Sequence, residues 1–137
     1  MQEKHRLWKD SVLFYLGGMT YVTVEFLWRG YSHCSMFVVG GADFLLMGKL
    51  PQKLPLALRM FCGAAIITAS ELISGTVVNE YLGLNVWDYS KLPFNYRGQI
   101  SLVFSLLWVP LSAMALLENR FFRKKLFHEP MPRLIWA

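Results

Sequence analysis

The most constraining feature of the sequence is the separation of its apolar residues from its basic ones. The chain has 137 residues, of which 55% are hydrophobic and only 17% are charged. Lys and Arg crowd into the two ends and one central loop, and the long apolar stretches between them are nearly free of charge. In a soluble domain, about a quarter of the residues are usually charged. The pattern therefore predicts an integral membrane protein.

Four apolar stretches are long enough to cross a bilayer. A hydrocarbon core of about 30 Å needs about 20 helical residues. The sequence predicts transmembrane helices over residues 11–28, 31–50, 56–84 and 100–117. No internal repeat is present, so we expect one all-α, four-helix transmembrane domain over residues 1–125, followed by a basic, irregular tail over residues 126–137.

The charges that flank these spans agree on one orientation. The loops on one side hold only Arg29, Lys91 and Arg97, because all other Lys and Arg residues lie before the first span, between the second and third, or after the fourth. Basic loops stay in the cytoplasm, so the sequence predicts that both termini are cytoplasmic. The net charge of +5 is explained by this topology and by contact with anionic lipids, and no nucleic-acid partner is expected.

Carboxyl groups within the predicted spans are candidate functional groups, because a charge in the bilayer costs several kcal/mol unless it is paired or hydrated. Glu71 is the strongest candidate, since it lies about 18 Å along the third span from Arg59, near the midplane. Glu25 has Arg29 one turn later, which fits either a structural ion pair or a substrate contact. Asp43 fits a capping, a snorkelling or a functional role.

Two stretches are more specific than generic membrane sequence. Residues 25–36 read EFLWRGYSHCSM, and residues 82–95 read LGLNVWDYSKLPFN. With ELISG at residues 71–75, they resemble the family of small bacterial multipass membrane proteins named putative ABC-transporter type IV, or CmpB-like proteins. The resemblance covers roughly residues 10–120. It implies a permease-like protein of the bacterial cytoplasmic membrane.

The chain itself has no Gly-rich phosphate loop that ends in Lys-Ser/Thr. An ATPase that worked with this chain in an ABC system would therefore be a separate protein. No cofactor and no metal are implied.

The predicted topology gathers the motif residues on the outer side. We expect a substrate-binding pocket for a small polar ligand or ion, with Glu71 at its floor and residues 83–99 as its cover. The alternative is that these side chains form a structural network that pins the loop to the bundle. The predicted site comprises Glu25, Arg29, His33, Glu71, Trp87, Asp88, Asn95 and Arg97.

Three classes of function fit this pattern. The first is transport by a permease subunit or small carrier, which would work as a homodimer or with other membrane subunits because four helices do not easily enclose a path alone. The second is a non-catalytic scaffold or accessory subunit of a larger complex. The third is an intramembrane enzyme with His33, Glu71 and Asp88 as acid–base groups. The sequence has no pair of His one helical turn apart and no Gly-x-Ser-x-Gly motif, so it favours transport over catalysis.

Overall fold

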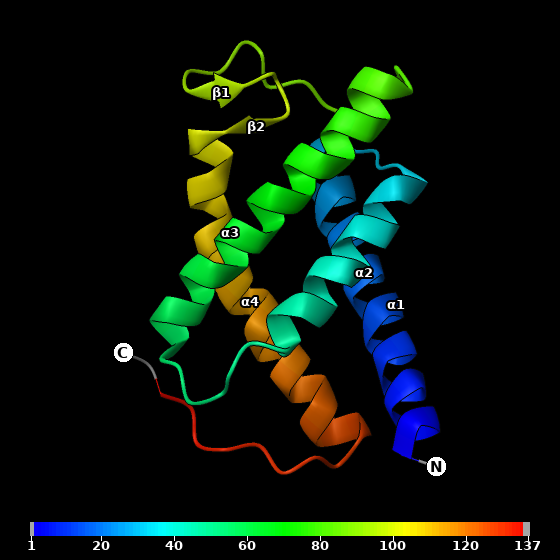
Figure 1. Ribbon diagram of the computed structural model, residues 1–137, viewed down its shortest axis with the longest axis vertical. Helices are drawn as coiled ribbons and strands as arrows, with labels where there is room; N and C mark the ends of the chain where they lie inside the picture. Colours follow the sequence, from blue (N-terminus) through cyan, green and yellow to red (C-terminus); the bar gives the residue numbers. More distant parts are fainter. Residues whose placement is uncertain (1, 136–137) are drawn as a thin grey trace.

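The structure is a computed structural model that describes residues 2–135, and it is mostly helical. Its four α-helices alternate in direction, so that the two loops at one end of the bundle are α1–α2 and α3–α4 (Figure 1). A π-helical turn, η1, continues α3, and a two-stranded antiparallel sheet precedes α4. The elements are α1 (Gln2–Arg29), α2 (Cys34–Gly48), α3 (Leu56–Gly75), η1 (Thr76–Tyr81), β1 (Asn95–Tyr96), β2 (Ile100–Ser101) and α4 (Leu102–Leu126).

Two helices of the described chain are long and apolar enough to cross a membrane. They are the continuous helix Leu56–Tyr81 and α4, each with a mean hydropathy of 1.6 over its most apolar window. The other two helices fit the expectation less closely. Helix α1 has the length, but Gly, Thr and Tyr interrupt its apolar residues, and α2 is apolar but has only 15 residues. At about 1.5 Å per residue, α2 extends about 22 Å, which is less than a typical hydrocarbon core.

Helices α1 and α2 pack closely because glycines line their contact. A Cβ atom at Gly18 would lie 2.7 Å from the Phe37 carbonyl oxygen, and one at Gly41 would lie 2.7 Å from the Phe14 carbonyl oxygen. Each obstacle is backbone, which cannot rotate away as a side chain can. Small residues permit this close backbone approach in membrane helices.

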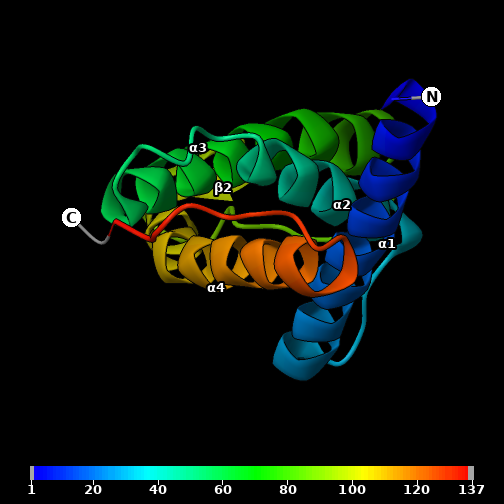
Figure 2. The same cartoon turned by 90° about the horizontal axis from the view of Figure 1, so that it is seen from below.

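The tail after α4 lies against the bundle instead of extending from it. It runs back beneath α4 towards the start of α3 (Figure 2). Leu134 packs on the apolar cluster that includes Leu56 and Leu116, and the Leu56 N–H donates to the Ile135 carbonyl oxygen. Residues 127–135 contain no helix or strand, and the last two residues of the predicted tail, 136–137, lie outside the described residues.

The loop between η1 and α4 is held to the bundle by buried amides. In η1 the backbone shifts to a five-residue hydrogen-bond step, seen where the Leu82 N–H donates to the Val77 carbonyl oxygen. Within this turn, the Asn79 side chain donates to Gln99 Oε1 at 2.8 Å and accepts the Val86 N–H at 2.7 Å. These bonds fix both ends of the loop next to the end of α3.

Candidate functional site

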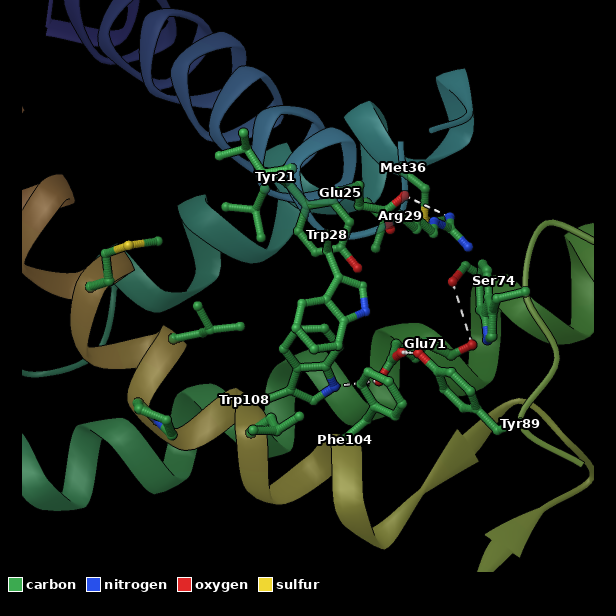
Figure 3. A pocket seen from close by; sticks show the side chains of 18 residues that line it. Tyr21, Glu25, Trp28, Arg29, Met36, Glu71, Ser74, Tyr89, Phe104 and Trp108 are labelled. Carbon is green, nitrogen blue, oxygen red and sulfur yellow. Dashed lines mark hydrogen bonds and ion pairs between the residues drawn. The ribbon is translucent and has the colours of Figure 1, made fainter. Parts of the chain in front are cut away.

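A cavity of about 600 Å³ lies between the C-terminal half of α1, the second half of α3 and the first half of α4. The loop adds two aromatic residues to its wall, Trp87 and Tyr89. Figure 3 shows Tyr89 beside Glu71 and Phe104. Three charged side chains line it, namely Glu25, Arg29 and Glu71. Most of the other lining residues are apolar or aromatic, so the cavity presents few, specifically placed polar groups, as small-molecule sites do.

Glu71 is buried on α3, with 4% of its surface exposed, and both of its carboxyl oxygens accept a hydrogen bond. The Tyr89 hydroxyl donates to Oε2 at 3.0 Å, and the Trp108 indole N–H donates to Oε1 at 2.5 Å. One donor comes from the loop and the other from α4, so the carboxyl group connects three parts of the fold (Figure 3). The sequence treated Glu71 as an acid without a partner, whereas the structure gives it two neutral donors.

The aromatic donors are themselves held by stacking. The Tyr89 ring lies over the Phe104 ring, with a centroid separation of 4.6 Å and an interplanar angle of 9°. Phe104 in turn contacts Trp108, and Trp108 contacts Tyr21 of α1. Burial raises the pKa of the Tyr89 hydroxyl above its ordinary value, and the neighbouring Glu71 carboxylate raises it further. Tyr89 therefore remains a neutral donor.

Glu25 and Arg29 form an ion pair beside the cavity. Arg29 Nη2 lies 2.6 Å from Glu25 Oε2, and its Nη1 donates to the Val86 carbonyl oxygen at 2.8 Å. The guanidinium also lies 4.5 Å from the centroid of the Tyr31 ring. Arg29 thus compensates Glu25 and ties the end of α1 to the loop. Among residues 2–135, Glu71 is left as the acid in the cavity wall without a basic partner within ion-pairing distance.

Of the eight residues predicted for the site, four line the cavity: Glu25, Arg29, Glu71 and Trp87. Trp87 has an additional structural task, because its indole N–H donates to the Gln99 carbonyl oxygen at 2.9 Å. A substrate contact from any of these four remains a prediction.

The other four predicted residues do not line the cavity, and their polar atoms serve local structure. His33 caps α2 by accepting the Ser35 N–H, and Asn95 accepts the Gly98 N–H within the loop. Arg97 pairs with Glu80 at 2.7 Å. Asp88 is exposed and accepts the Ser90 N–H at 2.9 Å, and this bond holds the pKa of Asp88 below its ordinary value. Of these contacts, the Arg97–Glu80 pair joins the loop to η1 and the others are local, so a ligand contact and a loop-pinning network both remain predictions for these four residues.

Sequence reasoning missed the aromatic part of the site: Tyr21, Tyr89, Phe104 and Trp108. Signals for three of them were present. Trp108 lies on the polar face of the fourth apolar stretch, Tyr21 is one turn before Glu25, and Tyr89 follows Trp87 and Asp88. That these rings would meet around Glu71 depends on how the loop folds back, which the spacing does not determine.

The rim of the cavity is apolar and exposed. Leu27 and Trp28 on α1 and Leu107 and Met114 on α4 line the cavity and are also exposed at the protein surface. The predicted cover, residues 83–99, forms one wall. The rim itself lies between α1 and α4, on the side of the bundle.

A comparison with known families identifies the family of the chain. A family model described as Putative ABC-transporter type IV matches residues 9–134. The chain belongs to this family. The match includes α2, α3, α4, α1 from residue 9 onwards, and every residue that lines the cavity of this type IV family member. No curated protein and no solved structure matches the chain.

Proposed function

We propose that this chain is a transport protein of the bacterial cytoplasmic membrane, a permease subunit or small carrier, whose cavity binds a small cation at Glu71. The observation that carries the proposal is the buried Glu71 carboxyl group, held by Tyr89 and Trp108 in the wall of a cavity of about 600 Å³. An ionisable group within a membrane span is a functional candidate by default. Its family membership fits a role in transport.

The lining supports a cation with an apolar body as the ligand. Tyr21, Trp28, Trp87, Phe104 and Trp108 present aromatic rings to the cavity. Ring faces attract cations, by about 0.5–2 kcal/mol each depending on solvation. With Glu25 compensated by Arg29, the charge that a ligand would meet is that of Glu71. A zwitterion or an anion would lack a free basic partner in this wall.

In the proposed topology all four α-helices cross the bilayer, with both termini and the α2–α3 loop in the cytoplasm. The short helix α2 packs along α1 through the glycine contact, so it need not span the full thickness unaided. The exposed apolar rim between α1 and α4 would then face lipid or a second subunit. A homodimer or another membrane subunit would complete the path, and an ATPase that drives it would be a separate protein.

A ligand-binding experiment tests the proposal. Purified protein is heated in detergent with tetraphenylphosphonium, choline or sodium, beside Glu71→Gln and the control Asp88→Asn. Gln keeps an oxygen for the Trp108 N–H and offers its amide to the Tyr89 oxygen, so the variant should fold. We expect a probe to raise the melting temperature of the parent and of the control, but not of Glu71→Gln. A probe present at about a hundredfold its dissociation constant stabilises by about 2.7 kcal/mol.

The second candidate function is a scaffold or accessory subunit of a larger membrane complex. It is favoured by the loop network of Asn79, Gln99 and Trp87, which needs no ligand. In that case no probe would shift the parent, and Glu71→Gln would melt at the same temperature as the parent or above it.

A further inference from the structure

A second, smaller cavity of about 60 Å³ lies deeper in the bundle, among all four α-helices. Asp43 on α2 and Thr20 on α1 supply polar groups to its lining, which is otherwise mainly apolar or aromatic. Space of this size has room for at least one water molecule. Because most of the lining is apolar, a water there would be held by the polar groups of Asp43 and Thr20.

The carboxyl group of Asp43 lacks a full set of hydrogen-bond partners in this position. Only 3% of its surface is exposed, and its Oδ2 accepts the Ser70 hydroxyl at 2.8 Å. Its Oδ1 is buried and has no hydrogen-bond partner among residues 2–135. A buried carboxyl oxygen without a partner is costly, and a carboxylate without a counterion is more so. A bound proton, water molecule or cation would therefore stabilise the Asp43 carboxyl group.

The small cavity adjoins the large one. Five residues line both: Tyr21, Val24, Trp108, Leu111 and Met114. A single layer of side chains thus separates Asp43 from the space beside Glu71. Two members of that layer are polar, and one of them, Trp108, already donates to Glu71.

The small cavity is also connected towards the opposite end of the bundle. Thr20 lines it, and the Thr20 hydroxyl donates to Glu118 Oε1 at 2.6 Å. Glu118 lies on α4, within two turns before the basic residues Arg120, Arg123 and Lys124. Three carboxyl groups, Glu71, Asp43 and Glu118, therefore follow one another from the large cavity to the basic end.

Among residues 2–135, no basic side chain forms an ion pair with Asp43 or lines its cavity. The titratable groups whose charges interact with it are Tyr21 on α1 and Glu71 on α3, and Glu118 of α4 is reached through Thr20. Among the residues that line the two cavities, Arg29 is the one basic side chain, and it is paired with Glu25. A mobile cation would neutralise Asp43, and a small, mainly apolar cavity with a single carboxyl group suits a proton.

We propose that Asp43, lining the small cavity with Thr20 and linked through it to Glu118, is the inner station of a proton path that begins at Glu71. A proton leaves the Glu71 carboxyl group, crosses through water the layer of side chains that line both cavities, and binds the Asp43 carboxylate. It then passes to Glu118 and to the cytoplasm, so each carboxyl group gains one proton and loses one, and each water or hydroxyl group that relays a proton is left chemically unchanged. The path rests on the proposed function, because it would couple ligand movement at Glu71 to the proton gradient.

Proton flux tests the path directly. The full chain is reconstituted into liposomes that contain the pH dye pyranine, and a pH gradient is imposed with potassium and valinomycin present. Asp43→Asn keeps the shape of the side chain and an acceptor for Ser70 but cannot carry a proton. Its control is Asp10→Asn, the same change at a half-buried acid of α1 outside both cavities. We expect flux in the parent and the control, and the rate of protein-free liposomes in Asp43→Asn.

A second variant and a second measurement keep the result decisive. Thr20→Val removes the hydrogen bond to Glu118 at nearly constant side-chain volume, so proton flux should fall in this variant too. It tests the path even if Asp43→Asn fails to fold. Equal flux in the parent and in either folded variant would overturn the path, as would a parent that never conducts, with or without tetraphenylphosphonium. The melting-temperature shift by that probe is measured on the same samples. It reports on the large cavity alone, so loss of the path and loss of the proposed function are distinguished.

Discussion

At the scale of single residues, Glu71 is defined by its donors. A buried carboxyl group without hydrogen bonds would destabilise the fold by several kcal/mol, and two neutral N–H and O–H donors offset much of that cost. Neutral donors leave the acid without an ion pair, so it can accept a proton or a cationic ligand. An arginine in place of these neutral donors would have kept the Glu71 carboxylate ion-paired and negatively charged.

Removing one donor gives a direct prediction. Tyr89→Phe keeps the stack on Phe104 but takes the hydroxyl from Glu71, and we expect the free energy of unfolding to fall by about 1–2 kcal/mol. Reversible denaturation of the purified protein in mixed micelles measures the change. The matched control is Tyr96→Phe, at an exposed ring that makes no side-chain hydrogen bond within the described residues. Equal stability of the two variants would show that the Tyr89 bond does not support the buried acid.

The sequence identified the acidic residues of the site more successfully than it identified their hydrogen-bond and ion-pair partners. The spacing of Glu25 and Arg29 predicted their ion pair, because residues four apart on a helix are neighbours. Asp88, Asn95 and Arg97 were grouped with them because all follow the third apolar stretch. The hydrogen bonds of a loop depend on its backbone turns, and positive φ angles at Asn85, Phe94 and Arg97 bend this loop in ways that residue type alone does not signal.

At the scale of elements, the end of α3 decides where the loop lies. The five-residue step of η1 inserts an extra residue into the helical repeat and so changes the direction in which Asn79 points. From there its amide reaches both Gln99 and the Val86 N–H. The apolar pattern predicted a helix to residue 84, and the structure ends it at Tyr81. A π turn leaves no trace in the pattern.

Asn79 should therefore control the order of the loop. Asn79→Ala leaves the buried Val86 N–H and the Gln99 Oε1 oxygen without partners, at a cost of about 1–3 kcal/mol each. We expect faster cleavage within residues 83–99 by a protease added to proteoliposomes, and weaker probe binding because Trp87 and Tyr89 lose their places. Tyr81→Ala, at an exposed residue of the same turn, is the control and should be cleaved as slowly as the parent. Equal protection of Asn79→Ala would mean that other contacts hold the loop.

The helices themselves were the most predictable elements, since each apolar stretch produced one α-helix. Their ends were less predictable. Polar residues 2–10 extend α1, and α4 continues to Leu126, because charged residues form helix as readily as apolar ones outside a membrane. Helix α2 is shorter than its apolar stretch, because His33 caps its start and Lys49 its end.

At the scale of the whole molecule, the two cavities and the tail divide the bundle into two ends. The end with the loop contains the aromatic site and Glu71, and the other contains Glu118, the basic residues and the tail that is tied to the start of α3. Charge asymmetry in the sequence predicted these ends. The sequence did not predict that Asp43 and Thr20 would line one small cavity between these ends, since that depends on four helices meeting at one depth.

The orientation of those ends is the prediction on which the transport proposal depends. In a background of Cys34→Ser and Cys62→Ser, single cysteines replace the exposed Lys4, Lys53 and Lys91. We expect a membrane-impermeant maleimide to label Lys91→Cys in intact cells, and the other two only after the membrane is opened, because basic loops stay in the cytoplasm.

Each other pattern of labelling has a distinct meaning. If the short helix α2 does not cross the bilayer, Lys53→Cys becomes accessible from outside while Lys91→Cys does not, because α3 then starts from the opposite side. Labelling of Lys4→Cys in intact cells would show that the whole orientation is the reverse of the predicted one, with the aromatic cavity nearer the cytoplasm. Either result would overturn a path from an outer ligand site to an inner Asp43. The expected pattern would place Glu71 on the side from which an external cation arrives.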